Sequence, residues 1–185
     1  SIIERYCRLG LSSRLGNSIQ HSLLSSGLLF FAFISTGHRR IKILKLTDKG
    51  RKVLGCEVSR MKRQGGIEHE YWKKKIAERL RDQGYIVQEE YPIGSGKTVD
   101  LVATKGGRQI AIEVETGKSD VDANIEKSRR AGFKTILSMT TNSKARDIST
   151  QEAMQNWEHV SRMTTSEFMN LSSTEITRRF NNIMK

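Results

Sequence analysis

The sequence has few of the features that mark secreted, metal-clustered or membrane-spanning proteins. Its 185 residues include only two cysteines, Cys7 and Cys56, so no disulfide framework and no cysteine ligand cluster is expected. It has no run of about 20 apolar residues, as a membrane span would require, and its most apolar stretch, residues 23–34, is short and broken by serine and glycine. We therefore expect no membrane segment and a reducing, cytoplasmic location.

Positive charge is what the sequence has in excess. There are 32 Lys and Arg against 20 Asp and Glu, giving a net charge of +12. Such an excess is typical of proteins that bind nucleic acid, although it can also serve solubility alone. Residues 1–66 carry 13 basic and three acidic side chains, whereas residues 67–185 carry 19 and 17. This change, next to the Gln64-Gly65-Gly66 connector, predicts two domains, residues 1–66 and 67–185.

The basic part has the pattern helix, helix, hairpin, helix. Helices are predicted over residues 2–9 and 13–26, two strands over 28–34 and 39–46, and a last helix over 51–63. In the second helix, the apolar side chains Leu15, Ile19, Leu23 and Leu24 share one face, which we expect to point inward.

The string LTDKGRKVLG (Leu46 to Gly55) resembles the segment that leaves the wing in winged helix-turn-helix DNA-binding domains. The resemblance implies that the second helix enters the major groove and that the hairpin contacts the DNA backbone. The candidate DNA-binding residues are Arg14, Asn17, Gln20 and His21 on the helix, and His38, Arg39, Arg40 and Lys42 on the hairpin. The alternative is a winged helix that contacts protein, with these charges merely solvated.

The second part has the order αβββαβ, which predicts a small α/β layer. Helices are expected over 68–81 and 120–130, and strands over 85–91, 99–103, 109–115 and 135–139, with a hairpin turn at 105–108. In the first of these helices Tyr71, Ile76 and Leu80 are expected to face inward and the lysines, Lys73 among them, outward. In the tail we expect a helix over 142–156, an edge strand over 157–163 and helix caps at Ser166 and Ser172.

Three carboxylates on two neighbouring strands form a candidate catalytic site. Glu113 and Glu115 are two residues apart on one strand, so they point to the same face, and Asp100 lies on the adjacent strand. Such a cluster needs a cation, and oxygen ligands favour Mg²⁺ or Mn²⁺. A divalent ion beside a basic DNA-binding module suggests phosphodiester hydrolysis. The alternative is that the glutamates form the solvated face of an edge strand.

The string VDLVATKGGRQIAIEVETGK (Val99 to Lys118) resembles the core motif of the PD-(D/E)XK, or restriction-endonuclease-like, nucleases, and especially that of archaeal Holliday-junction resolvases. The resemblance implies a mixed sheet flanked by helices, with Asp100 and Glu113 as metal-binding carboxylates. Glu115 stands where the motif usually has lysine. The cationic role would then fall to Lys118 or Lys97.

A further acidic residue often comes from the first helix of this superfamily, and Glu70 is the candidate here, with Glu68 and Glu78 as alternatives. Asn124 is a candidate for orienting a water or a phosphate, or for a surface cap. His69 and His159 have no partner at metal-ligand spacing and are set aside.

The resulting expectation is a magnesium-dependent endonuclease that binds duplex or branched DNA and forms a homodimer, as many enzymes of this fold do. An RNA-directed nuclease would share the same site. A rival expectation is a non-catalytic DNA-binding module that docks onto a larger ATPase or a regulator. IEVETGKSD (Ile112 to Asp120) behind a winged helix is similar to the terminal module of some HerA-like ATPases, which suggests a motor ATPase as partner.

Overall fold

The computed structural model describes residues 2–36, 40–56, 66–117, 120–141 and 160–183. The chain is a mixed α/β protein that divides into two compact units. The first comprises residues 1–33 and 42–64, and the second residues 34–41 and 65–185. No helix in the described parts is long and apolar enough to cross a membrane.

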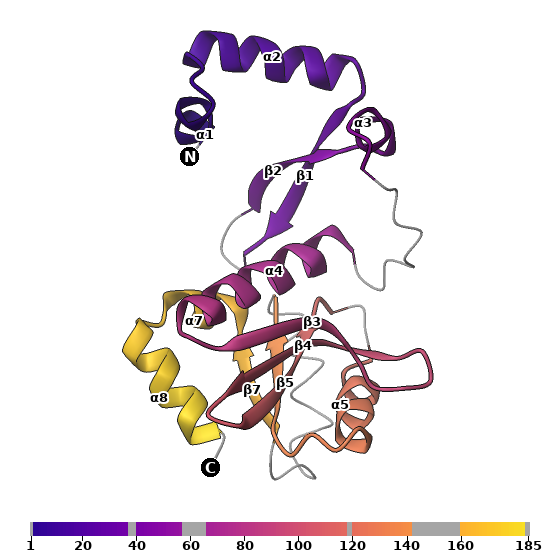
Figure 1. Cartoon of the computed structure of the whole chain (residues 1–185), viewed down its shortest axis with the longest axis vertical. Helices are drawn as coiled ribbons and strands as arrows, with labels where there is room; N and C mark the ends of the chain where they lie inside the picture. Colours follow the sequence, from indigo (N-terminus) through magenta and orange to yellow (C-terminus); the bar gives the residue numbers. More distant parts are fainter. Residues whose placement is uncertain (1, 37–39, 57–65, 118–119, 142–159, 184–185) are drawn as a thin grey trace. The chain divides into compact units, whose positions relative to one another are not determined.

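The N-terminal elements follow the predicted order helix, helix, hairpin, helix (Figure 1). They are α1 (Ile2–Arg8), α2 (Ser13–Ser25), β1 (Leu29–Ser35), β2 (Arg40–Leu46) and α3 (Asp48–Val53), and β1 and β2 pair as a two-stranded sheet. The side chain of Ser12 accepts from Leu15 N and begins α2, and Thr47 begins α3 in the same way.

The third helix differs from its prediction at both ends. It begins at Asp48 rather than Arg51 and ends at Val53, well before Arg63. Gly55 adopts a φ of +64°, a left-handed conformation that commonly ends helices. Residues 57–63 of the predicted helix lie outside the described residues.

The buried face of α2 was predicted only in part, since Leu23 and Leu24 are half-buried but the other two residues of that face are exposed. Leu15 and Ile19 are 50% and 40% exposed, and the buried residue of the helix is Gly16. A Cβ at Gly16 would lie 2.5 Å from the ring of Tyr6, so the glycine is what lets the tyrosine pack on this helix. Apolar periodicity could not reveal a contact that depends on the absence of a side chain.

The second unit contains a five-stranded mixed sheet in the order β3-β4-β5-β6-β7. Its strands are β3 (Ile86–Pro92), β4 (Thr98–Lys105), β5 (Arg108–Glu115), β6 (Ile136–Thr140) and β7 (Val160–Thr164). Pairing is antiparallel from β3 to β5 and parallel from β5 to β7. Gly106 and Gly107 both have positive φ and form the predicted two-residue turn between β4 and β5. β5 is therefore the central strand.

Helices flank this sheet (Figure 1). α4 (Ile67–Asp82) contacts β3, β4 and β5, and α5 (Val121–Arg130) contacts β5 and β6. Ile125 and Val121 of α5 pack with Val102, Ala111 and Ile136 of the sheet. The predicted mixed α/β sheet with flanking helices is thus confirmed.

The C-terminal helices are α7 (Thr165–Asn170) and α8 (Ser173–Ile183). Ser172 and Glu175 exchange side-chain-to-backbone hydrogen bonds and cap α8, as predicted. The predicted cap at Ser166 is wrong, because the N-cap of α7 is Thr164, two residues earlier, which forms a capping box with Glu167. The helix predicted over 142–156 and the first residues of the predicted edge strand lie outside the described residues.

Candidate functional site

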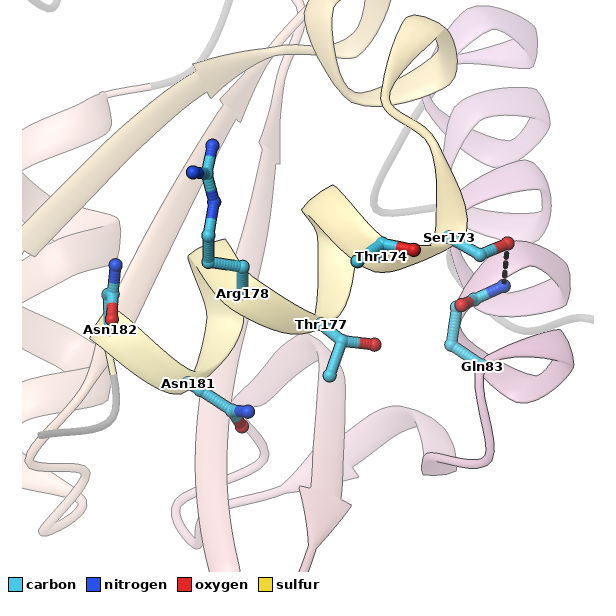
Figure 2. A pocket seen from close by; sticks show the side chains of 7 residues that line it. All are labelled: Gln83, Ser173, Thr174, Thr177, Arg178, Asn181 and Asn182. Atoms are coloured by element: carbon cyan, nitrogen blue, oxygen red, sulfur yellow. Dashed lines mark hydrogen bonds between the residues drawn. The ribbon is translucent and has the colours of Figure 1, made fainter.

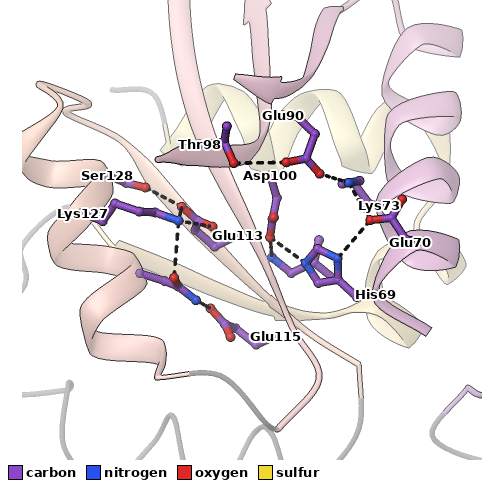
Figure 3. Close-up of polar contacts among 12 residues, drawn as sticks. His69, Glu70, Lys73, Glu90, Thr98, Asp100, Glu113, Glu115, Lys127 and Ser128 are labelled. Carbon is purple, nitrogen blue, oxygen red and sulfur yellow. Dashed lines mark hydrogen bonds and ion pairs between the residues drawn. The ribbon is translucent and has the colours of Figure 1, made fainter. Parts of the chain in front are cut away.

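Asp100 and Glu113 lie opposite each other where β4 and β5 begin to separate (Figure 3). The paired register ends at Leu101 and Ile112, and one step further along it brings Asp100 to Glu113. Instead of the next backbone pair, Oδ2 of Asp100 accepts a hydrogen bond of 2.8 Å from the Val114 N–H. The aspartate is therefore held to the neighbouring strand by its side chain.

Both glutamates of the motif are buried on the central strand. Glu113 is 1% and Glu115 is 0% exposed. This excludes the alternative in which the two side chains form the solvated face of an edge strand. Buried carboxylates require partners, because burying an uncompensated charge is unfavourable.

Two residues of α5 provide the partners of Glu113. The hydroxyl of Ser128 donates to Oε1 at 2.6 Å, and Nζ of Lys127 lies 3.1 Å from the same oxygen. Burial and then the charge of Asp100 raise the pKa of Glu113 to about 7, and Lys127 and Ser128 only partly oppose this. Glu113 therefore changes its charge near neutral pH.

Glu115 has a different environment. Asn124 donates from Nδ2 to Oε1 of Glu115 at 3.1 Å, and its own Oδ1 lies 3.4 Å from the Lys127 ammonium. Asn124 is thus neither a cap nor a surface residue, since Asp120 caps α5. Across the described ranges, no group of three or more His, Cys, Asp or Glu side chains is placed to hold a metal ion. The three predicted carboxylates are therefore not gathered into one ligand cluster.

His69 of α4 contacts Asp100, a pairing that sequence reasoning missed. Its Nε2 lies 3.0 Å from Oδ2 of Asp100, and its Nδ1 lies 3.6 Å from Glu70, an electrostatic contact too long for a hydrogen bond. Burial disfavours the imidazolium, but Asp100 and Glu70 outweigh it and raise the pKa of His69 to about 9. In return, His69 and the Val114 N–H hold the pKa of Asp100 below its usual range despite burial.

Lys73 extends a chain of polar contacts at this end of the sheet, which runs from Asp100 through His69 and Glu70. Predicted to face outward, it is only 3% exposed, and its ammonium contacts both Glu70, at 2.8 Å, and Glu90. Thr98 donates to the other oxygen of Glu90 at 3.1 Å. The sequence held a signal for this arrangement. The apolar residues of α4 recur at helical spacing, and the same face continued toward the start of the helix includes His69 and Lys73. The buried residues of that face are His69, Trp72, Lys73, Ile76, Ala77 and Leu80.

Glu90 itself has unusual backbone geometry. Its φ is +51°, which is uncommon for residues other than glycine. By register it is opposite Asp100, between the pairs Glu89–Leu101 and Tyr91–Val99. Strained residues persist only where the surroundings hold them, and here Lys73 and Thr98 do so.

The remaining predicted site residues lie elsewhere. Lys97 is exposed in the loop before β4, and Lys118 lies outside the described residues. Glu70 joins the site only through His69 and Lys73. Neither alternative contacts Asp100. Glu78 pairs with Lys75, and Oε1 of Glu68 is buried with no hydrogen-bond partner among the residues that the structure describes.

Most of the predicted DNA-binding residues that the structure describes are exposed, in the first unit except for Arg40, which the division places in the second. Arg14, His21, Arg40 and Lys42 are exposed, with the ammonium of Lys42 3.5 Å from the centre of the Phe31 ring. The hydroxyl of Tyr6 lies 3.1 Å from the side-chain oxygens of both exposed Asn17 and half-buried Gln20, which share its single proton as acceptors, and this ties α2 to α1. His38 and Arg39 lie outside the described residues.

Comparison with known proteins gives little further information. No family model matches the chain, and no curated protein matches it. Among solved structures, a protein of unknown function named AF1548 is similar, with 16% sequence identity and a TM-score of 0.37. The match covers 60% of this chain and 66% of that one, so it spans just under two thirds of the length of AF1548.

Proposed function

We propose that the chain is a magnesium-dependent nuclease of the restriction-endonuclease-like type, with a DNA-binding winged helix at its N-terminus. The observation that carries the proposal is the pair of carboxylates on the neighbouring antiparallel strands β4 and β5, where half-buried Asp100 lies opposite fully buried Glu113. Their pKa values are displaced in opposite directions, as is common for paired carboxylates at catalytic sites.

The donor set suits magnesium. This ion prefers oxygen ligands, and one or two carboxylates suffice because water and substrate phosphate fill its other positions. Asp100 and Glu113 would hold it, whereas Glu115 is engaged by Asn124. When bound, magnesium supplies the Lewis acidity that polarises a phosphodiester.

The side chains around these carboxylates have separate roles in the proposal. His69 and the Val114 N–H fix one oxygen of Asp100 and leave its other oxygen for the ion. Lys127 takes the cationic role that the motif usually gives to the residue at position 115. Its ammonium would stabilise the charge that develops on the phosphate during cleavage.

The proposed DNA-binding part rests on charge and element order. Residues 1–66 hold most of the net positive charge, and Arg14, His21, Arg40 and Lys42 are exposed within it. If these side chains contact DNA phosphates, DNA binding depends strongly on salt concentration. Duplex or branched DNA as substrate, and a homodimer as the active form, remain parts of the same proposal.

A second candidate function is favoured by the same lysine. Lys127 and Ser128 already satisfy Glu113, so the carboxylate has a counter-charge without any metal. The sheet would then be a docking platform for a motor ATPase or a regulator, and the chain would bind DNA without cutting it.

Cleavage and ion binding measured together separate the two candidates. The purified chain is incubated with magnesium and linear duplex, single-stranded or branched DNA, or with RNA, and titrated with magnesium and manganese by calorimetry. A nuclease cuts at least one substrate, and Asp100→Asn and Glu113→Gln abolish both cutting and ion binding. Glu126→Gln is the matched control, because Glu126 is a carboxylate of α5 paired with Arg129 and Arg130. Salt-dependent DNA binding without cleavage or ion binding would identify the docking module.

A further inference from the structure

A polar groove lies over α8, in the second unit (Figure 2). Its volume is about 730 Å³, and α4 contributes to it through Gln83, just beyond the end of that helix. The described residues that line it are Gln83, Ser173, Thr174, Thr177, Arg178, Asn181 and Asn182. None of the residues proposed for metal binding or cleavage is among them.

The groove is chemically uniform. Its described lining consists of three hydroxyls, three carboxamides and one guanidinium, with no carboxylate and no aromatic or aliphatic side chain. Small-ligand pockets are usually lined by aromatic and aliphatic side chains, and the described lining of this groove includes neither, although carbon atoms of the lining residues make up most of its exposed surface. Arg together with Ser, Thr, Asn and Gln is instead the set of side chains that contacts phosphate and sugar oxygens of nucleic acids.

The lining is arranged along one helical face. Positions 173 and 174, 177 and 178, and 181 and 182 recur every four residues, so successive polar pairs lie about 6 Å apart along the helix axis. Such a row presents repeated donors and acceptors to an extended polymer rather than a single closed site.

The groove is held rigidly from beneath. Ile176 and Phe180 of α8 are fully buried, and the Phe180 ring packs against Tyr85 and Phe168. At the rim, Gln83 Nε2 donates to Ser173 Oγ at 3.1 Å. A surface fixed in this way loses little conformational freedom on binding.

We propose that this groove binds the sugar–phosphate backbone of a nucleic acid strand, with Arg178 as the principal phosphate contact. The inference is independent of the proposed cleavage, because a docking module that holds DNA would use the groove equally. It adds a second nucleic-acid contact to a chain whose basic excess lies in residues 1–66.

The test measures binding of the full chain to fluorescent single-stranded and duplex oligonucleotides over a range of salt concentrations. Arg178→Ala should weaken binding several-fold for all sequences and reduce the slope of log affinity against log salt by about one. Arg179→Ala is the matched control, since Arg179 is its exposed neighbour on α8 but does not line the groove. The control should change the slope by much less.

Cross-linking tests the location separately. With Cys7→Ser and Cys56→Ser as background, a photo-crosslinker on Asn181→Cys should attach to bound DNA, and one on Ile86→Cys, an exposed position of β3, should not. Equal effects of Arg178→Ala and Arg179→Ala, or no cross-link at position 181, would overturn the proposal. Complete displacement of the oligonucleotide by inorganic phosphate, with total ionic strength held constant, would also overturn it. The groove would then be a site for small phosphorylated molecules.

Discussion

Lys127 of α5 places its ammonium 3.1 Å from Oε1 of Glu113 on β5. In the nuclease motif that the sequence resembles, the cation comes from the strand itself, at the position that Glu115 occupies here. Here the positive charge beside Glu113 therefore comes from a helix packed on the sheet, and not from the strand that carries the carboxylate. The role of this contact differs between the two proposed functions. In the nuclease Lys127 stabilises the charge on the phosphate, whereas in the docking module it only neutralises Glu113.

Replacing Lys127 with alanine should therefore abolish most cleavage while preserving ion binding. Loss of one group that stabilises transition-state charge costs about 100- to 1,000-fold in rate. Lys127→Arg, which keeps the charge, should retain part of the activity. The measurement is single-turnover cleavage, with magnesium affinity determined in parallel.

Arg130→Ala is the control for this experiment, since Arg130 is an exposed cation of the same helix whose partner is Glu126. Cleavage by Lys127→Ala at the wild-type rate would remove the lysine from the mechanism.

The raised pKa of Glu113 should make stability fall as the pH rises. The pKa moves from 4.5 to about 7, so between these values the folded chain holds this proton more tightly than the unfolded chain does. The contribution of Glu113 is greatest below about pH 4.5 and is lost as the pH passes 7. Thermal unfolding in metal-free buffers should show the decline, and Glu113→Gln should remove it.

His69 should produce a second decline at higher pH. Its pKa is raised from 6.5 to about 9, so its stabilising contribution is complete below 6.5 and is lost as the pH passes 9. Glu113→Gln should leave this later decline in place.

If Glu113→Gln keeps the earlier decline between pH 4.5 and 7, the carboxyl group responsible for that decline is not Glu113.

The sequence predicted the sheet of the second unit well, because strand alternation and turn glycines act locally. The turn at Gly106 and Gly107 and the strands on either side follow the expected register. Alternation also placed Glu113 and Glu115 on one face. It could not show that Asn124 separates their roles, since that depends on how α5 packs on the sheet.

Residues brought in by helices were the ones missed. Lys73 was predicted to face outward, His69 lacked a partner at ligand spacing, and Lys127 lies outside the motif that drew attention to the carboxylates. Each finds its partner on another element, 14 to 31 residues away along the chain. Tertiary packing decides such pairs, and a single sequence carries only the helical periodicity of α4 as a hint.

Substituting His69 should weaken ion binding even though the histidine is not proposed as a ligand. His69 orients Asp100 through a 3.0 Å contact, and loss of such a partner typically lowers metal affinity about 10- to 100-fold. His69→Gln keeps most of the volume and is the variant of choice for manganese titration by calorimetry. His21→Gln, at an exposed position of α2, should leave the affinity unchanged. Unaltered affinity in both variants would show that Asp100 needs no support from α4.

A pair of glycine substitutions should locate stability in the first unit. A Cβ at Gly50 would lie 2.2 Å from the backbone oxygen of Leu28, which also accepts the Thr47 N–H that positions α3. Gly50→Ala should therefore destabilise this unit by about 2 kcal/mol, even though alanine favours helix. Gly66→Ala, at the start of the second unit, is the control, because no described atom beyond its chain neighbours would lie within 4 Å of its Cβ and its φ is −72°. That change should stay within about 0.5 kcal/mol.

The two spectroscopic signals of urea unfolding can assign the effect of Gly50→Ala to one unit. Trp72 is buried in the second unit, so its fluorescence follows that unit, whereas far-ultraviolet circular dichroism follows helices of both. The experiment uses a Trp157→Phe background, because Trp157 lies outside the described residues. Gly50→Ala should shift the dichroism transition to lower urea and leave the fluorescence transition in place. An equal shift of both signals would mean that the two units unfold together, and the contact at Leu28 would then contribute to the stability of the whole chain.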